Sequence, residues 1–242
     1  MRLSLWSHPR SRSTALERYF QNRGDVLTHH EVLADYYYIH RRAEPIDHAQ
    51  LEGDRGLTYA EAAAVLLQAT EQPLMHKDFP YHAIDELCAD PRWLDGHHVI
   101  LVRDPRETLY SNLKLRGQVT AKNLGYADLW RWYRHLDAAG CRLLVVDSER
   151  LNAEPVEAIG ELCRFAGLSF DERHLSWPAD MNPDWAKWAG WHVDVAQSRG
   201  FGRAASVPDG WVAPAELDGV LAEAREIYAC LQERISAKAV SR

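Results

Sequence analysis

One stretch near the start of the chain decides the fold: Leu3-Ser4-Leu5-Trp6-Ser7-His8-Pro9-Arg10-Ser11-Arg12-Ser13-Thr14-Ala15-Leu16-Glu17-Arg18-Tyr19-Phe20. It predicts a short apolar strand, a polar loop and the first turns of a helix. Backbone N–H groups and the positive helix end meet at such a junction, which suits a phosphate or a sulfate. The loop adds two guanidinium groups and three hydroxyls, those of Arg10, Arg12, Ser11, Ser13 and Thr14. A solvated tail is the alternative, and its direct attachment to a strand argues against it.

The composition is that of a globular protein with one sizeable core. The chain has 242 residues, of which 46% are hydrophobic and 26% charged, and its net charge is −7. The negative charge argues against a nucleic acid as a general partner. We see no apolar run long enough to span a membrane and no signal-peptide pattern, so we expect no membrane partner and a cytoplasmic protein.

Metal binding is not expected from the cysteines or the histidines. The four cysteines are Cys88, Cys141, Cys163 and Cys230, and none forms a Cys-x-x-Cys pair. The twelve histidines include no His-x-x-x-His or His-Glu-x-x-His pattern, which would place two ligands on one helix face. We therefore predict no metal site.

Strands and helices alternate along the first 170 residues. The predicted strands are Leu3–Trp6, Asp25–His30, Leu74–Asp78, His98–Val102 and Arg142–Val146. This order predicts an α/β fold, a single domain with a central, mostly parallel sheet flanked by helices, as in P-loop NTPases. Four of these strands run into polar or ionisable residues at their carboxyl ends, where such sheets bind ligands, so we expect one shared site there.

We expect one domain over residues 1–242. A capping box of Thr58 and Glu61 begins a predicted helix that runs to Gln72, before Pro73. Residues 177–210 fit no period and are predicted to form a long loop that covers the cofactor and substrate site. Apolar residues at helical spacing predict a C-terminal helix over residues 214–237.

A second motif supports the first loop. Arg103 leaves a buried strand, Pro105 suits the first turn of the helix that follows, and Ser111 lies about two turns into that helix. Taken alone, these residues could form an ordinary salt bridge and a helix hydroxyl.

Together the two motifs resemble those of sulfotransferases that use 3′-phosphoadenosine-5′-phosphosulfate (PAPS). The first loop is similar to their 5′-phosphosulfate loop, often Pro-Lys/Arg-Ser-Gly-Ser/Thr-Thr, with Arg12 where many members have Gly. Arg103 and Ser111 match the Arg and Ser that hold the 3′-phosphate. The late residues Ser198, Arg199 and Gly200 resemble the segment that closes over the nucleotide, and the tryptophans before them suit bacterial members.

The resemblance implies transfer of a sulfuryl group from PAPS to a hydroxyl or amine, with 3′-phosphoadenosine-5′-phosphate (PAP) as the product. Arg10 would stabilise the leaving phosphate, and Lys77 would assist at the sulfuryl oxygens. Animal members use a His as base, and Phe79 stands at its position here. Some bacterial members use a Glu after the second strand, so we favour Glu31. The other candidates are His82, His30 and Asp78.

Two other functional classes stay open. A P-loop phosphotransferase needs Gly-x-x-x-x-Gly-Lys-Ser/Thr, and this loop has neither the glycines nor the lysine. A catalytically inactive nucleotide-binding relative is the second alternative. Tyr36, Tyr37, Tyr38 and the tryptophans fit a small aromatic or apolar alcohol as acceptor, although core packing explains them equally well. The sequence does not indicate an oligomeric state.

Overall fold

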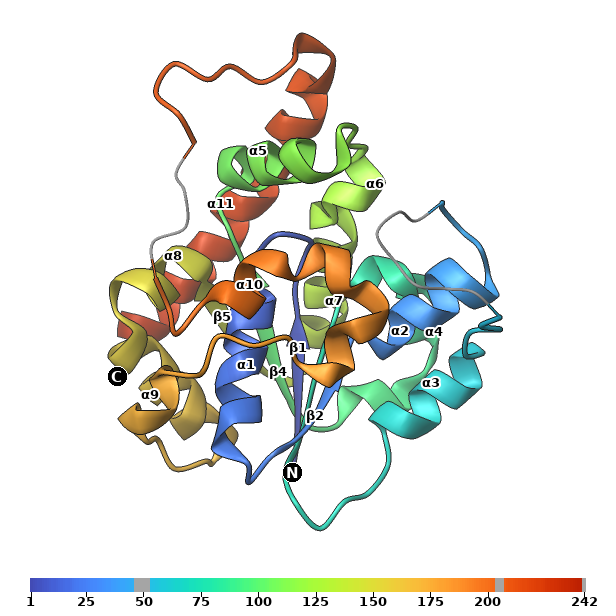
Figure 1. The fold of residues 1–242 in the computed structure, drawn as a ribbon, viewed down its shortest axis with the longest axis vertical. Helices are drawn as coiled ribbons and strands as arrows, with labels where there is room; N and C mark the ends of the chain where they lie inside the picture. Colours follow the sequence, from blue (N-terminus) through green and yellow to red (C-terminus); the bar gives the residue numbers. More distant parts are fainter. Residues whose placement is uncertain (46–52, 203–206, 241–242) are drawn as a thin grey trace.

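The computed structural model describes residues 1–45, 53–202 and 207–240. Its centre is a five-stranded parallel sheet with the strand order β2-β3-β1-β4-β5 (Figure 1). The strands are β1 (Arg2–Trp6), β2 (Leu27–His30), β3 (Leu74–Asp78), β4 (His97–Val102) and β5 (Arg142–Asp147). The predicted fold class is therefore confirmed, with β1 in the middle of the sheet.

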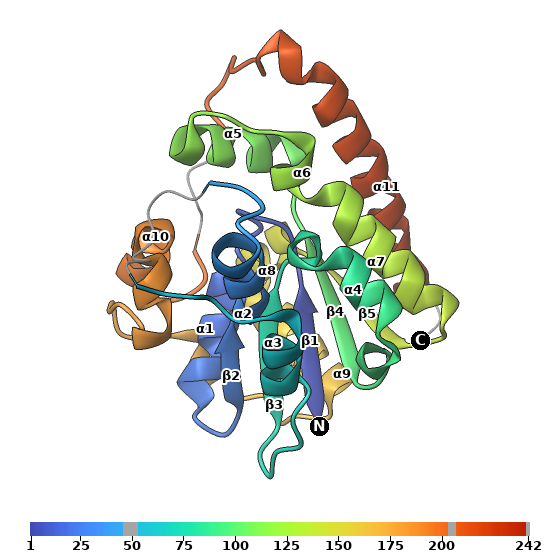
Figure 2. The same ribbon diagram turned by 90° about the vertical axis from the view of Figure 1, so that its right-hand side faces the viewer.

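The two faces of the sheet are covered by different helices (Figure 2). Leu3 and Leu5 of β1 belong to the cluster packed around α1 (Ser13–Arg23) and α9 (Pro155–Ala166). Successive strand residues point to opposite faces. Trp6 accordingly packs on the other side, in the cluster that includes residues of α3, α4, α7 and α11.

The remaining helical segments connect these layers. They are α2 (Val32–Ala34), the π-helical η1 (Asp35–His40), α3 (Tyr59–Leu66), η2 (Pro80–His82), α4 (Ile84–Ala89), η3 (Pro91–Leu94), α5 (Pro105–Arg116), α6 (Ala121–Leu124), α7 (Tyr126–Ala138), α8 (Ser148–Ala153), η4 (Glu172–Leu175), η5 (Pro183–Trp191), α10 (Val193–Gln197), η6 (Ala215–Leu217) and α11 (Asp218–Val240). None of the described helices is both long and apolar enough to cross a membrane.

The centre of the core is built around Trp6, which is fully buried. Its ring lies edge-on to Trp93 and Trp132, with centroids 5.6 and 5.5 Å away. Its indole nitrogen donates a hydrogen bond to His98 Nδ1 at 3.2 Å. The end of β1 is thereby fixed just before the chain enters the loop that begins at Ser7.

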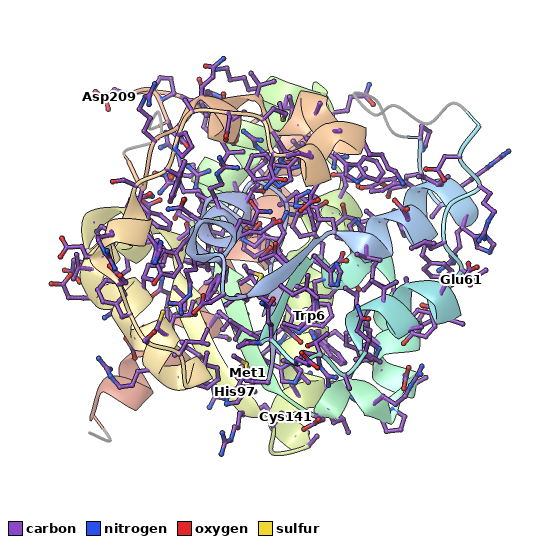
Figure 3. The ribbon with its side chains drawn as sticks, turned by 60° about the horizontal axis from the view of Figure 1, so that its bottom comes forward. Met1, Trp6, Glu61, His97, Cys141 and Asp209 are labelled. Atoms are coloured by element: carbon purple, nitrogen blue, oxygen red, sulfur yellow. The ribbon has the colours of Figure 1, made fainter. Side chains whose placement is uncertain are left out.

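The carboxyl ends of the central strands lie at the same edge of the sheet. The register places Trp6 opposite Asp78 of β3 and Ile100 of β4, so these three strands reach the same edge. Met1, His97 and Cys141 mark the opposite edge, at the amino ends of β1, β4 and β5 (Figure 3). From β1 the chain moves outward to β2, returns through β3 and then crosses to β4, which is the kind of switch point where such sheets bind ligands.

Two predicted elements differ from the structure. The helix that starts after Thr58 has the expected capping box but ends at Leu66, because residues 68–72 bury no apolar side chain that would hold further turns. The predicted covering loop 177–210 contains the helices η5 and α10, and its residues 203–206 lie outside the described part. The predicted helix over 214–237 begins with η6 and continues as α11.

Candidate active site

The loop after β1 turns through two unusual backbone conformations. Arg10 has φ 63° and Arg12 has φ 70°, both in the left-handed region that normally favours glycine. Arg12 directly precedes α1, and its side chain forms no capping hydrogen bond with that helix. The first N–H groups of α1 point toward the loop, where an anion can accept their hydrogen bonds.

The two sequence motifs meet in space. Arg10 Nε donates to Ser111 Oγ at 2.9 Å, and Arg103 Nη1 donates to the backbone oxygen of Arg10 at 3.0 Å. The backbone N–H of Arg103 donates to His8 Nε2 at 3.1 Å. Residues separated by about one hundred positions therefore form one basic site at the carboxyl ends of β1 and β4.

Two carboxylates hold the guanidinium groups of this basic site. Glu107 Oε2 accepts from Arg103 Nη2 at 2.6 Å and lies 3.5 Å from Arg12 Nη2. Glu149 Oε1 lies 2.9 Å from Arg12 Nη1 and 3.9 Å from Arg103 Nε. The two carboxylates fix the direction of both arginines and match their formal charge.

Glu31 and Lys77 form the second part of the site. Glu31 follows β2 directly, has φ 43° and forms an ion pair with Lys77 near the end of β3. Lys77 Nζ also lies 3.4 Å from Thr14 Oγ1, at the start of α1. Burial by itself would raise the pKa of Glu31, but the Lys77 ammonium and nearby imidazoles lower it to about 2. Glu31 is therefore a carboxylate at neutral pH.

A chain of buried polar groups lies behind Glu31. His30 Nδ1 donates to Glu17 Oε2 at 2.6 Å, and His30 Nε2 lies 3.0 Å from His192 Nε2 and 3.8 Å from Glu31 Oε1. In the tautomer of His30 that carries its proton on Nδ1 alone, Nε2 accepts from His192 Nε2. Burial and the neighbouring His30 lower the pKa of His192 to about 2, which agrees with a neutral imidazole.

Three of these side chains have metal-ligating atoms close together, namely His30, Glu31 and His192. Each already has a protein partner, and the ammonium of Lys77 beside Glu31 opposes a cation. We retain the expectation that the site works without a metal.

His82 and Asp78 form another buried pair. His82 Nδ1 donates to Asp78 Oδ1 at 2.6 Å, and its Nε2 has no hydrogen-bond partner among the described residues. Asp78 also accepts from the backbone N–H groups of Leu33 and Phe79. Asp78 is thus fully engaged in structural bonds, whereas His82 keeps a free nitrogen.

Aromatic side chains surround His82, and their role as the wall of an acceptor pocket stays a prediction. Tyr37, Tyr38, Phe79 and Tyr81 have ring centroids between 4.4 and 5.5 Å from that of His82. They belong to a third buried cluster, whose other members are Ala34, Ile39 and Trp188. Tyr36 lies apart from it, with its hydroxyl donating to Glu86.

The segment formed by η5 and α10 covers the basic site. Asp194 Oδ2 lies 3.1 Å from Arg10 Nη2, and the backbone oxygen of Trp191 accepts from Arg10 Nη1 at 3.3 Å. Ser198 hydrogen-bonds to Trp177 and to the backbone oxygen of Val195. The next two residues pair with the backbone around Trp177. The backbone oxygen of Arg199 accepts from the N–H of Trp177, and Gly200 forms a β-bridge with Ser176. A role of Ser198, Arg199 and Gly200 in nucleotide binding stays a prediction.

The site retains unused hydrogen-bonding capacity that fits an anionic ligand. The hydroxyl oxygens of Ser7 and Ser11 and the Nε of Arg12 are buried without a hydrogen-bond partner among the described residues. Buried polar atoms normally have partners. These groups lie in the loop that the sequence assigns to a phosphosulfate, so the residues present fit that group.

The sequence reasoning missed Glu17, His192 and Asp194. Glu17 is fully buried between the apolar residues Leu16 and Phe20. A charged residue so close to the apolar face of a predicted helix could have indicated a buried polar contact. The other two residues lie in a segment without periodicity, which gives no signal for their positions.

Comparison with known proteins agrees with this geometry. The family model described as a sulfotransferase domain matches residues 1–235. Two solved structures have TM-scores of 0.53 and 0.55. They are the sulfotransferase domain of the Synechococcus PCC 7002 olefin synthase, 18% identical over 94% of both chains, and mouse sulfotransferase SULT7A1 complexed with PAP, 13% identical over 97% of this chain and 88% of that one.

A plant relative shares part of its sequence with this chain. Branched-chain-amino-acid aminotransferase-like protein 2 of Arabidopsis thaliana is 27% identical over 203 residues, which is 81% of this chain and 35% of the relative. The chain thus spans about a third of the length of that curated relative. The family model covers nearly the whole chain, and the chain belongs to the sulfotransferase domain family.

Proposed function

We propose that this protein transfers a sulfuryl group from PAPS to a hydroxyl or amine of a small-molecule acceptor. The observation that carries the proposal is the contact between the two motifs, in which Arg10 bonds to Ser111 and Arg103 bonds to the backbone of Arg10. The family membership supports the same chemistry. The residues that would bond a phosphosulfate and a 3′-phosphate therefore lie at one sheet edge.

The basic loop would bind the donor. Its arginines, hydroxyls and the N–H groups of α1 stabilise negative charge on the 5′-phosphate as it becomes the leaving group. Arg103 and Ser111 would hold the 3′-phosphate, and Ser198, Arg199 and Gly200 would close over the nucleotide. The donor supplies the sulfuryl group: its bond to the phosphate oxygen breaks while a bond to the acceptor oxygen or nitrogen forms.

Glu31 is the base we favour. It is ionised, partly accessible and next to Lys77, which would neutralise the sulfuryl oxygens during transfer. The acceptor proton moves to a Glu31 oxygen as the new bond to sulfur forms. His82 is the second candidate because its Nε2 is free, whereas the nitrogens of His30 and the oxygens of Asp78 are occupied by structural bonds.

The acceptor is expected to be a small aromatic or apolar alcohol. The aromatic cluster around His82 supports this expectation, since rings recognise flat apolar groups. The cytoplasm stays the expected compartment, and a bacterial origin stays an interpretation of the tryptophan-rich segment.

Calorimetric titration with PAP, adenosine 5′-phosphate (AMP) and ATP tests the nucleotide assignment. We expect PAP to bind tightest, because it carries the 3′-phosphate that Arg103 and Ser111 would hold. Arg103→Ala should weaken PAP binding by about tenfold or more, since a charge-assisted bond to phosphate is lost. Arg92→Ala is the control, because Arg92 is also an ion-paired arginine but pairs with Asp90, away from the site.

The titration also separates the alternatives. A preference for ATP would favour the phosphotransferase and contradict our proposal. Tight PAP binding without sulfuryl transfer from PAPS to any of a set of phenols and amines would favour an inactive relative.

A further inference from the structure

At Arg12 this chain differs from the loop pattern of its family. The backbone conformation of Arg12 is one that is unfavourable for a residue with a side chain. Its φ of 70° and ψ of 16° lie in the left-handed region. A residue with a Cβ atom is held there at a cost of about 1 kcal/mol relative to glycine. Contacts of the Arg12 side chain must compensate for that cost.

Those contacts lie beside Arg103. Arg12 lies against Glu107 and Glu149, and both carboxylates also approach Arg103. The Arg12 side chain is 14% exposed and that of Arg103 is 6% exposed. The two guanidinium groups are therefore close together, partly buried and directed by the same two carboxylates.

The position of Arg12 also separates it from the sulfuryl end of the site. The sulfuryl end is marked by Lys77, which contacts Thr14 and Glu31. Arg12 instead extends toward the strand end that carries Arg103. Its Nε is buried without a hydrogen-bond partner among the described residues, so the guanidinium has a donor to offer. Burial, and after it the nearby Arg103, lower the pKa of Arg12, while Glu149 and Glu107 oppose that shift.

We propose that Arg12 binds the 3′-phosphate of the nucleotide together with Arg103, and so determines the preference for a 3′-phosphorylated donor. This inference rests on the proposed function. A phosphate at this position would give the unpartnered Nε of Arg12 an acceptor, and it can accept from a planar guanidinium through two oxygens.

The test compares PAP with AMP, which lacks only the 3′-phosphate, on the intact chain by calorimetry. Arg12→Gly removes the side chain and permits the left-handed conformation, so the loop keeps its path. We expect the Kd for PAP to rise about tenfold or more and the Kd for AMP to change less than about threefold. Arg12→Asn is a second variant, since asparagine tolerates the same conformation and has no charge.

Arg42→Gly is the matched control. Arg42 is an exposed arginine with φ 51°, so its replacement by glycine also relieves left-handed strain. It should leave both dissociation constants unchanged. Thermal unfolding of each variant shows whether a change in binding reflects loss of the fold.

Three results would overturn the inference. An unchanged PAP affinity in both Arg12 variants would leave Arg12 as a structural partner of Glu149. Equal losses for PAP and AMP would place Arg12 at the 5′-phosphate. A gain in PAP affinity would show that Arg12 opposes the nucleotide. Failure of the proposed function looks different, because the unmodified protein would then bind PAP no better than AMP.

Discussion

Glu31 and Lys77 come from neighbouring strands and form one ion pair at the carboxyl edge of the sheet. The left-handed backbone at Glu31 is a strained conformation for a residue with a side chain, and such strain is concentrated at functional positions. The pair joins a carboxylate to an ammonium that lies against Thr14 at the start of α1. This arrangement suits a transfer in which a proton leaves the acceptor while negative charge moves toward the loop.

Glu31→Gln tests the base directly. The amide keeps the shape of the side chain but cannot take a proton, so we expect sulfuryl transfer from PAPS to 2-naphthol to fall about a hundredfold or more. PAP affinity should stay within about threefold, because Glu31 is not among the residues that we propose to bind the nucleotide. Production of PAP from PAPS is the measured quantity.

Glu157→Gln, at an exposed carboxylate of α9 away from the site, is the control for handling and charge. Transfer at the normal rate by Glu31→Gln would contradict the assignment and make His82→Ala the next variant. A hundredfold loss in His82→Ala would then move the role of base to the Asp78–His82 pair.

Site residues at strand ends were predictable, because a polar residue that ends an apolar strand of a parallel sheet lies at the edge where ligands bind. Glu31, Lys77 and Arg103 are of this kind, and the structure places each at the common edge. Glu17 was not predictable in the same way. Its partner His30 comes from another element, and only the packing of α1 on β2 brings the two together.

At the scale of elements, the segment of η5 and α10 packs against the basic site. It is attached at several points: Asp194 and the backbone of Trp191 contact Arg10, and His192 contacts His30. The Arg116 guanidinium also lies over the Trp191 ring, 4.4 Å from its centroid. Asp194 thus places a carboxylate on a guanidinium that the donor would need.

Asp194→Asn should strengthen PAP binding. The carboxylate competes with the nucleotide for Arg10, but its side chain is 86% exposed, so the gain should be modest, about two- to fivefold. Calorimetry measures the affinity, and Asp184→Asn is the control, since Asp184 is an exposed carboxylate on the same segment. Weaker PAP binding by Asp194→Asn would show instead that Asp194 helps to close the segment over the ligand.

Elements with a clear hydrophobic period were predicted well, and this segment was not. The buried runs that became β4 and β5 lie between the two helical layers, and the apolar spacing of α11 reflects its contact with one of these layers. Trp185 and Trp188 of η5 are also buried, but they pack into different surroundings across a kink at Trp188. Because such packing has no fixed period, the sequence indicated only an ordered, irregular cover.

At the scale of the whole molecule, the fold buries two histidines, His8 and His98, in hydrogen bonds that use the neutral imidazole. His8 donates from Nδ1 to the backbone oxygen of Pro9 and accepts from the Arg103 N–H, so both nitrogens are used. His98 accepts from Trp6 at the centre of the core. Burial lowers the pKa of His8 to about 3 and that of His98 to about 4.

This burial predicts acid sensitivity of the fold below neutral pH. The unfolded chain takes up these protons near the ordinary histidine pKa of about 6.5, whereas the folded protein does not until pH 4 or lower. The stabilisation is therefore fully present above about pH 6.5 and is lost as the pH falls toward 4. Each such histidine should lower the free energy of unfolding by about 1.4 kcal/mol per pH unit within that window.

His98→Gln tests the origin of the effect. Glutamine retains an acceptor for the Trp6 indole but does not titrate. As the pH falls, the free energy of unfolding of the variant should therefore decrease less steeply than that of the unmodified protein, by the slope that one titrating proton contributes. Urea unfolding at pH 7.5, 6 and 5 gives the slope, and His40→Gln, at an exposed histidine, should not alter it. An unchanged slope in His98→Gln would mean that His98 is protonated in the folded protein, and that the core around Trp6 accommodates the charge.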